Sequence, residues 1–164
     1  MLKLFDLPAH TFFVHAPAVL IPLVSLAAAA IAVRPVWRRR YGWLVLAGSV
    51  ATLAATLLAV SSGEAFDEFL DGAVPTARHE ELGEQTRLLV LLLVLLITAT
   101  VWWGRRSDGR GHQTPATTRR TAIVLAVLTI AVASAATVWV VMTGHEGARI
   151  TWTGIFPDEP DGQE

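Results

Sequence analysis

The 164-residue sequence contains no cysteine, and charged residues make up only 16% of it. Without thiolates, disulfides and cysteine-ligated metal sites are excluded, so any metal or cofactor must be held by His, Asp, Glu or Met. Apolar residues make up 53% of the chain and are concentrated in long runs. This composition excludes an ordinary soluble domain and indicates a membrane protein.

Four apolar segments are long enough to cross a bilayer, which requires roughly 20 residues in a helix. Ionisable side chains are missing from their interiors, except for His15, one turn inside the first segment. This absence argues against a proton relay or ion pathway through the bilayer centre, so we do not expect a transporter. No internal repeat is evident. The segments cover residues 12–33, 43–62, 88–103 and 121–143.

The first segment differs from a cleaved signal peptide. Its apolar run is longer than a usual signal core, and its charge follows the run, at Arg34, instead of preceding it. We therefore expect it to be the first helix of the mature protein.

Arginines in two short connections predict the orientation, because cytoplasmic loops are enriched in Lys and Arg. Both connections should be cytoplasmic, which places the second connection and both termini outside. The arginines are Arg34, Arg38, Arg39 and Arg40 in one connection and Arg105, Arg106, Arg110, Arg119 and Arg120 in the other.

The predicted fold is therefore all-α: a multi-pass protein of the cytoplasmic membrane with four transmembrane helices in an up-down bundle and both termini outside. A single domain, residues 1–156, should contain helices at about 12–33, 43–70, 75–104 and 120–143. Residues 157–164 should form a flexible acidic tail. The expected partners are the lipid bilayer, an extracytoplasmic redox protein or quinone, and further copies or subunits in a membrane complex, but not nucleic acid.

Histidine and glutamate side chains gather at the predicted outer ends of all four helices. Side chains from facing helices are the usual means of building a metal or cofactor site in a four-helix bundle. At about 100° per residue, His79, Gly83, Thr86 and Val90 share one helix face, which we expect to point inward. The predicted site residues are His10, His15, Glu64, His79 and His145.

The stretch TGHEG, residues 143–147, follows the last apolar run. We predict that the helix ends at Gly144, because a glycine after the last turn commonly adopts the left-handed conformation. His145 would then turn back toward His79, and Glu146 would be solvated. The alternative is a solvated histidine after a helix cap.

Four stretches of the chain resemble the motifs of a bacterial four-helix membrane family, domain of unknown function 2231, over essentially its whole length. They are HTFFVHAPAVLIPL, SSGEAFDEF, RHEELGEQTRLLVLLLV and TGHEGARITWTG. The chain departs from the family's common form at Thr11, where Pro is usual, and at Ala16, where Phe is usual. The positions that match the motifs are His10, His15, Gly63, Glu64, His79, Gly144, His145 and Gly147.

This resemblance implies a fold and a topology more than an activity. The association of some relatives with Rieske or cytochrome domains implies a redox role. We expect the His/Glu cluster to bind haem b or a transition metal ion (Zn, Fe, Mn or Cu), with two histidines as ligands, in electron transfer. Two alternatives stay open: an accessory or assembly subunit whose polar cluster is structural, and a metal-dependent membrane enzyme that uses Glu64 as general base.

Overall fold

A computed structural model of the chain describes residues 3–4, 7–109 and 115–152. Two short strands, β1 (Lys3–Leu4) and β2 (Leu7–Pro8), pair antiparallel ahead of the helices. The helices are α1 (His10–Phe13), α2 (His15–Val33), α3 (Pro35–Leu70), α4 (Ala77–Gly109) and α5 (Pro115–Trp152).

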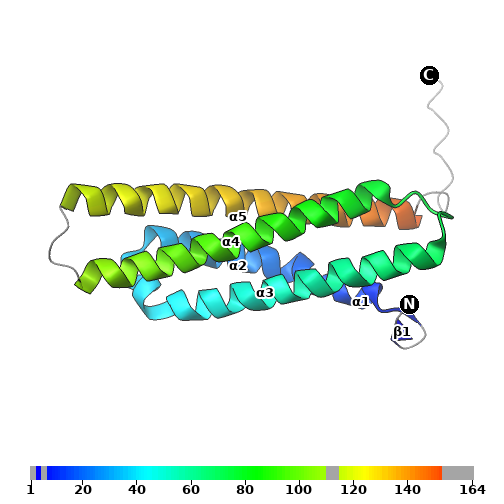
Figure 1. Cartoon of the computed structure of the whole chain (residues 1–164), viewed down its shortest axis with the longest axis horizontal. Coiled ribbons are helices and arrows are strands. Elements are labelled where there is room, and N and C mark those ends of the chain that lie inside the picture. The colour runs from blue at the N-terminus through cyan, green and yellow to red at the C-terminus, as the bar shows by residue number, and fades with distance from the viewer. Residues whose placement is uncertain (1–2, 5–6, 110–114, 153–164) are drawn as a thin grey trace, which may run out of the picture.

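Four long helices form an up-down bundle (Figure 1). Helix α2 packs against α3 and α5, and α4 packs against the same two helices, so α2 and α4 are diagonal to each other. Helix α1, the connection from α3 to α4 and the C-terminal end of α5 lie at one end, which we call the histidine end. The turn from α2 to α3 and the start of α5 lie at the other, the arginine end. All four helices are long and apolar enough to span a membrane, as the sequence predicted.

Small side chains allow the helices to approach closely. Ser49, Thr52 and Ala136 are buried, whereas large apolar side chains such as Leu26 and Leu44 are about 70% exposed on the outside of the bundle. Since a membrane interior offers no hydrophobic drive for helix association, close packing of small residues is what holds such bundles together. The largest buried cluster contains Val24, Ala28, Ile31, Val45, Leu93, Ile97, Val101 and Ala133.

Helix α3 begins at Pro35, earlier than the predicted start near residue 43, so Arg38–Arg40 are helical. Arg34 is extended, as expected before a proline, and Pro35 suits the first helical turn because it needs no backbone donor there. Long arginine stems can lie along apolar surface while their charged heads reach water, so the helix need not stop at the membrane surface. The helix ends before Asp71 and Gly72, whose φ angles are positive.

Helix α5 extends to Trp152 and does not end at Gly144 as predicted. Among the described residues, positive φ angles occur only at Asp71 and Gly72, so Gly144 keeps a helical backbone. An ion pair between Glu146 and Arg149, one turn apart, supports the extension. The predicted tail, residues 157–164, lies outside the described residues.

Candidate functional site

The ring of His10 lies against α3 at the histidine end. Its Nδ1 is 3.0 Å from the backbone oxygen of Ala59 and 3.2 Å from the hydroxyl of Ser62. A Cβ at Gly63 would lie 3.0 Å from Cε1 of this ring, which is closer than most real contacts. The imidazole therefore occupies the space that the glycine leaves open.

The ring of His79 repeats this arrangement against α5. Its Nδ1 is 3.0 Å from the backbone oxygen of Thr143, and a Cβ at Gly147 would lie 3.0 Å from its Cε1. In both cases the glycine follows the accepting carbonyl by four residues, one helical turn. Each histidine ring thus packs against a glycine and donates a hydrogen bond to the carbonyl one turn before that glycine.

The repetition continues down the bundle. Ile21 and Val90 each follow their histidine by eleven residues, and both are almost fully buried. Ala28 and Ile97 each follow by eighteen residues and are fully buried. The buried residues that follow His10 along α2 and those that follow His79 along α4 therefore have the same spacing, and α2 and α4 are diagonal to each other.

The two imidazoles meet at the centre of the histidine end. Their ring centroids are 6.1 Å apart, and their planes are nearly perpendicular, at 85°. Phe66 of α3 stacks on His10 with a centroid distance of 6.3 Å. Helix α1 positions His10 for this contact, and the helix is interrupted at Val14 because Pro17 has no N–H to donate to the carbonyl of Phe13.

The hydrogen bonds determine which nitrogen of each ring carries a proton. A backbone carbonyl can only accept, so Nδ1 of His10 and Nδ1 of His79 must both be donors. In a neutral imidazole the other nitrogen, Nε2, then has a lone pair. Metal-ligating histidines are commonly oriented in this way, by donating their second N–H to a carbonyl.

The structure does not bring the other predicted site residues to this pair. His15 at the start of α2, Glu64 on α3 and His145 on α5 are exposed. Among the described residues, none of them has a hydrogen bond or ring contact with His10 or His79, and no group of three or more His, Asp or Glu side chains is placed to hold a metal ion. Their roles as ligands, and that of Glu64 as a base, stay predictions.

His145 lies instead beside a shallow groove between α4 and α5. The predicted turn toward His79 does not form, since the helix continues through Gly144. Glu146, predicted to be solvated, is only 8% exposed and accepts hydrogen bonds from Arg149. The groove is lined by Arg78, Leu82, Val141, Met142, His145 and Glu146.

The inward face predicted for α4 is present. Thr86 and Val90 are buried, and the Thr86 hydroxyl lies 3.1 Å from that of Thr143. A Cβ at Gly83, one turn from His79 on the same helix, would meet no atom within 4 Å. The position of a side chain at Gly83 is therefore open.

The sequence predictions missed the backbone carbonyls of Ala59 and Thr143 and the stacking role of Phe66. Carbonyl groups carry no side-chain signal, so no residue type could have indicated them. The glycines did give a signal: Gly63 and Gly147 are both in the matched motifs, and each lies one turn beyond the carbonyl that anchors a histidine.

The sequence profile of the family described as "Predicted membrane protein (DUF2231)" matches residues 6–155. The chain belongs to this family. The family description agrees with the four spanning helices, and the protein is a multi-pass integral membrane protein. No curated protein and no solved structure matches the chain. Since the DUF2231 description names no activity, a function has to be argued from the site.

Proposed function

We propose that this DUF2231 protein binds a haem b iron between His10 and His79 at an extracytoplasmic histidine end, and that it acts in electron transfer. The observation that carries the proposal is the pair of imidazoles, whose ring centroids are 6.1 Å apart. Nδ1 of each ring donates to a carbonyl, so Nε2 would be the ligand nitrogen. The partner would be an extracytoplasmic redox protein or a quinone, which exchanges electrons with the site.

The number of ligands favours haem over a bare metal ion. Haem supplies four nitrogen ligands of its own and needs only axial ligands from the protein. A protein-held Zn²⁺ ion generally has three or four protein ligands. In the part of the chain that the structure describes, two imidazoles are close together and no third candidate ligand joins them.

The ring separation is also consistent with one iron between the rings. With 6.1 Å between their centroids, the two rings are close enough for both to hold one iron. The flat ring of Phe66, which stacks on His10, would border a macrocycle.

The chain's own groups would orient and tune the ligands. The carbonyls of Ala59 and Thr143 hold each ring in one tautomer, and such hydrogen bonds raise the basicity of the coordinating nitrogen. The Ser62 hydroxyl donates to the Ala59 carbonyl and accepts from His10, which further restricts that ring. His10 and His79 would hold the haem, which would supply one-electron chemistry there when bound.

An absorption spectrum of the purified protein, produced with haem supplied, tests the proposal. The wild type should show a Soret band that shifts on dithionite reduction, together with sharp α and β bands. His10→Ala and His79→Ala should each lose the sharp bands, because each removes one of the two residues that would hold the iron. His15→Ala and His145→Ala serve as controls from the same end of the bundle and should keep them.

Two results would overturn haem binding. A colourless protein with stoichiometric zinc or another metal ion, lost in the same two variants, would make the pair a metal site. A colourless, metal-free protein that assembles with other membrane subunits would make the polar cluster structural and the chain an accessory subunit. Size-exclusion profiles of each variant separate loss of ligand from loss of fold.

A further inference from the structure

The groove between α4 and α5 at the histidine end lies outside the contact between the two imidazoles. Its volume is about 360 Å³, within the range of about 300–1,000 Å³ that is typical of small-molecule sites. Because residues of two helices line it, side chains from both can contact one occupant. The lining residues are Arg78 and Leu82 of α4 and Val141, Met142, His145 and Glu146 of α5.

Polar and apolar residues follow each other in the same order on both helices. On α4, Leu82 follows Arg78 by four residues, which is about 6 Å further into the bundle. On α5, which runs the opposite way, Val141 precedes His145 by four residues and lies deeper by the same distance. The groove therefore matches a molecule with a polar head at the membrane surface and an apolar tail.

The apolar part of the groove is open to the outside of the bundle. Val141 is 62% exposed and Met142 is 38% exposed, whereas Leu82 is only 5% exposed. Since α4 and α5 are apolar enough to span a membrane, side chains exposed on this part of the bundle contact lipid. A ligand would enter from the bilayer, which favours a lipid-soluble molecule over a soluble redox protein.

The polar end of the groove offers hydrogen-bond donors and acceptors together. The side chains of Arg78 and His145 are exposed, and neither forms a hydrogen bond or an ion pair with another described residue. Both are near enough to the Glu146 carboxylate to interact with it electrostatically, so the three groups converge on one end of the groove. Glu146 accepts two hydrogen bonds from Arg149, and a carboxylate has lone pairs for further donors.

This mixture suits an uncharged ring with oxygen substituents better than a phosphate. The Glu146 carboxylate opposes an anionic headgroup, because like charges repel. A quinone carbonyl can accept a hydrogen bond from Arg78, and a quinol hydroxyl can donate to the imidazole of His145 or to Glu146. The apolar tail of the quinone would then lie over Val141 and Met142.

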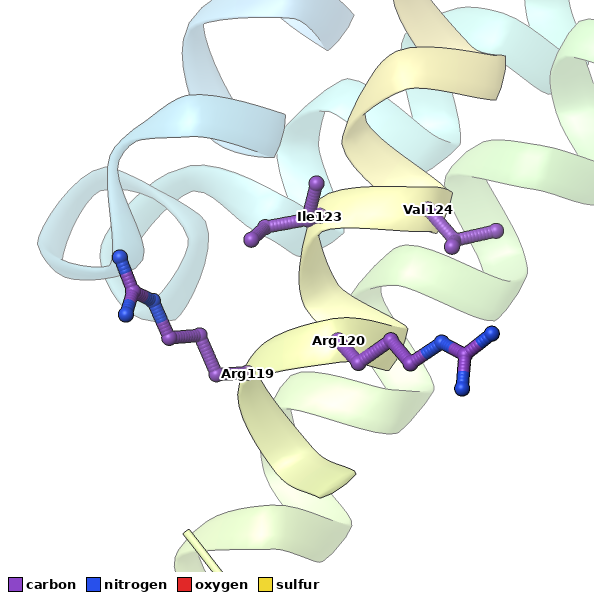
Figure 2. Close-up of a pocket in the computed structure, with 4 residues that line it drawn as sticks. All are labelled: Arg119, Arg120, Ile123 and Val124. Atoms are coloured by element: carbon purple, nitrogen blue, oxygen red, sulfur yellow. The ribbon is translucent and has the colours of Figure 1, made fainter. Parts of the chain in front are cut away.

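The hollow at the arginine end lacks this arrangement (Figure 2). Its four lining residues all belong to α5, and the side chains of Arg119 and Arg120 extend to opposite sides of that helix. Two cations that point apart do not converge on one small head group. The groove between α4 and α5 is therefore the better candidate for a ligand dissolved in the membrane.

We propose that the groove between α4 and α5 binds a quinone or quinol, with the oxygen substituents of the ring at Arg78 and His145 and the tail over the apolar residues. The choice of a quinone rests on the proposed electron transfer, because a redox partner that enters from the bilayer must be membrane-soluble. The groove lies next to the histidine pair. Arg78 directly precedes His79, and Glu146 directly precedes Gly147, against which the His79 ring packs.

Photolabelling of the full chain in phosphatidylcholine nanodiscs, with an azido-quinone that has a decyl tail, tests the proposal. The protein is produced without haem, so the result does not depend on haem binding. Labels should be confined to residues 78–82 and 141–146, and an excess of the unlabelled decyl quinone should reduce them several-fold. Arg78→Gln and His145→Ala should each reduce labelling several-fold as well. Arg120→Gln and His15→Ala, which change the same residue types outside the groove, should not.

Three outcomes would overturn the proposal. Labels spread over the lipid-facing surface and unaffected by the competitor would show that there is no quinone site. Labelling of the groove that is unchanged in Arg78→Gln and His145→Ala would exclude recognition by these side chains. Suppression by phosphatidylglycerol at constant quinone would make the groove a lipid site.

Two features of the design keep the results separate. Competition in the wild type decides between a site and no site, even if a variant fails to fold. Failure of the haem proposal would appear instead in the absorption spectrum of protein produced with haem, whatever the labelling shows.

Discussion

The ring centroids of His10 and His79 are 6.1 Å apart, although His10 lies on α1 and His79 lies on α4. Each ring packs against a glycine of a neighbouring helix and donates a hydrogen bond to the carbonyl one turn before that glycine. The contact is therefore a product of the assembled bundle, and its geometry depends on backbone positions as much as on the two imidazoles.

Gly63 and Gly147, which contact the two histidine rings, should respond differently to alanine substitution than other helical glycines do. Gly144→Ala should stabilise the protein by about 0.5–1 kcal/mol, because the new methyl group meets no atom within 4 Å and alanine favours the helix. Gly147→Ala, one turn further along α5, should not stabilise the protein in this way, because its Cβ would lie only 3.0 Å from Cε1 of the His79 ring. Denaturation in detergent micelles measures both changes.

The same comparison reports on the site. Gly147→Ala should weaken the binding of any chromophore, because the added methyl group would displace the His79 ring from the Thr143 carbonyl. Gly144→Ala should leave this binding unchanged. Equal stabilisation by the two substitutions, with identical spectra, would show that the His79 ring does not pack against Gly147.

At the arginine end, Gly104 should tolerate alanine only if Arg38 is shortened. A Cβ at Gly104 would lie 2.5 Å from Nε of Arg38, closer than atoms can approach, so that side chain must move. Overpacking of this kind typically costs about 1–3 kcal/mol. Gly104→Ala should therefore destabilise the wild type and should be nearly neutral in an Arg38→Ala background.

A double-mutant cycle measured by thermal denaturation checks this coupling. Additive effects of the two substitutions would mean that Arg38 does not lie across α4 at Gly104.

The orientation of the bundle is open to a direct measurement. A reporter fused after Ser107 should lie in the cytoplasm, and one fused after Asp161 should not, because the arginine-rich segments favour the cytoplasmic side. The reverse pattern would place the histidine pair at the cytoplasmic side and would exclude the proposed extracytoplasmic redox partner.

Much of the fold was predictable from the sequence. Four long apolar runs predicted four spans, and the predicted end of the second helix near residue 70 agrees with the end of α3 at Leu70. The helix boundaries at the membrane surface were less accurate. Long arginine side chains allow α3 to begin at Pro35. Gly144 and Gly147 keep a helical backbone, so α5 continues to Trp152. Residue type alone does not distinguish a glycine that ends a helix from one that accepts a neighbouring ring.

The site was only partly predictable, for a different reason. The five candidate residues all lie toward one end of the bundle, but which of them meet depends on helix rotation and on the diagonal arrangement of α2 and α4. His10 and His79 point inward, whereas His15 and His145 are exposed. The correspondence between the His10 and His79 environments is not visible in the sequence, because it consists of burial and a histidine–glycine contact and not of shared residues.

The position of the histidine pair along the bundle has an energetic consequence. The 19 residues of α2, about 28 Å of helix, separate it from the turn at Arg34, so it lies at one surface of the bilayer. Carrying one charge across the whole bilayer against 100 mV costs about 2.3 kcal/mol, but a charge that arrives and leaves at the same surface crosses almost none of that voltage. Under the proposed function, electron exchange at the pair would therefore have the same driving force in energised and de-energised membranes.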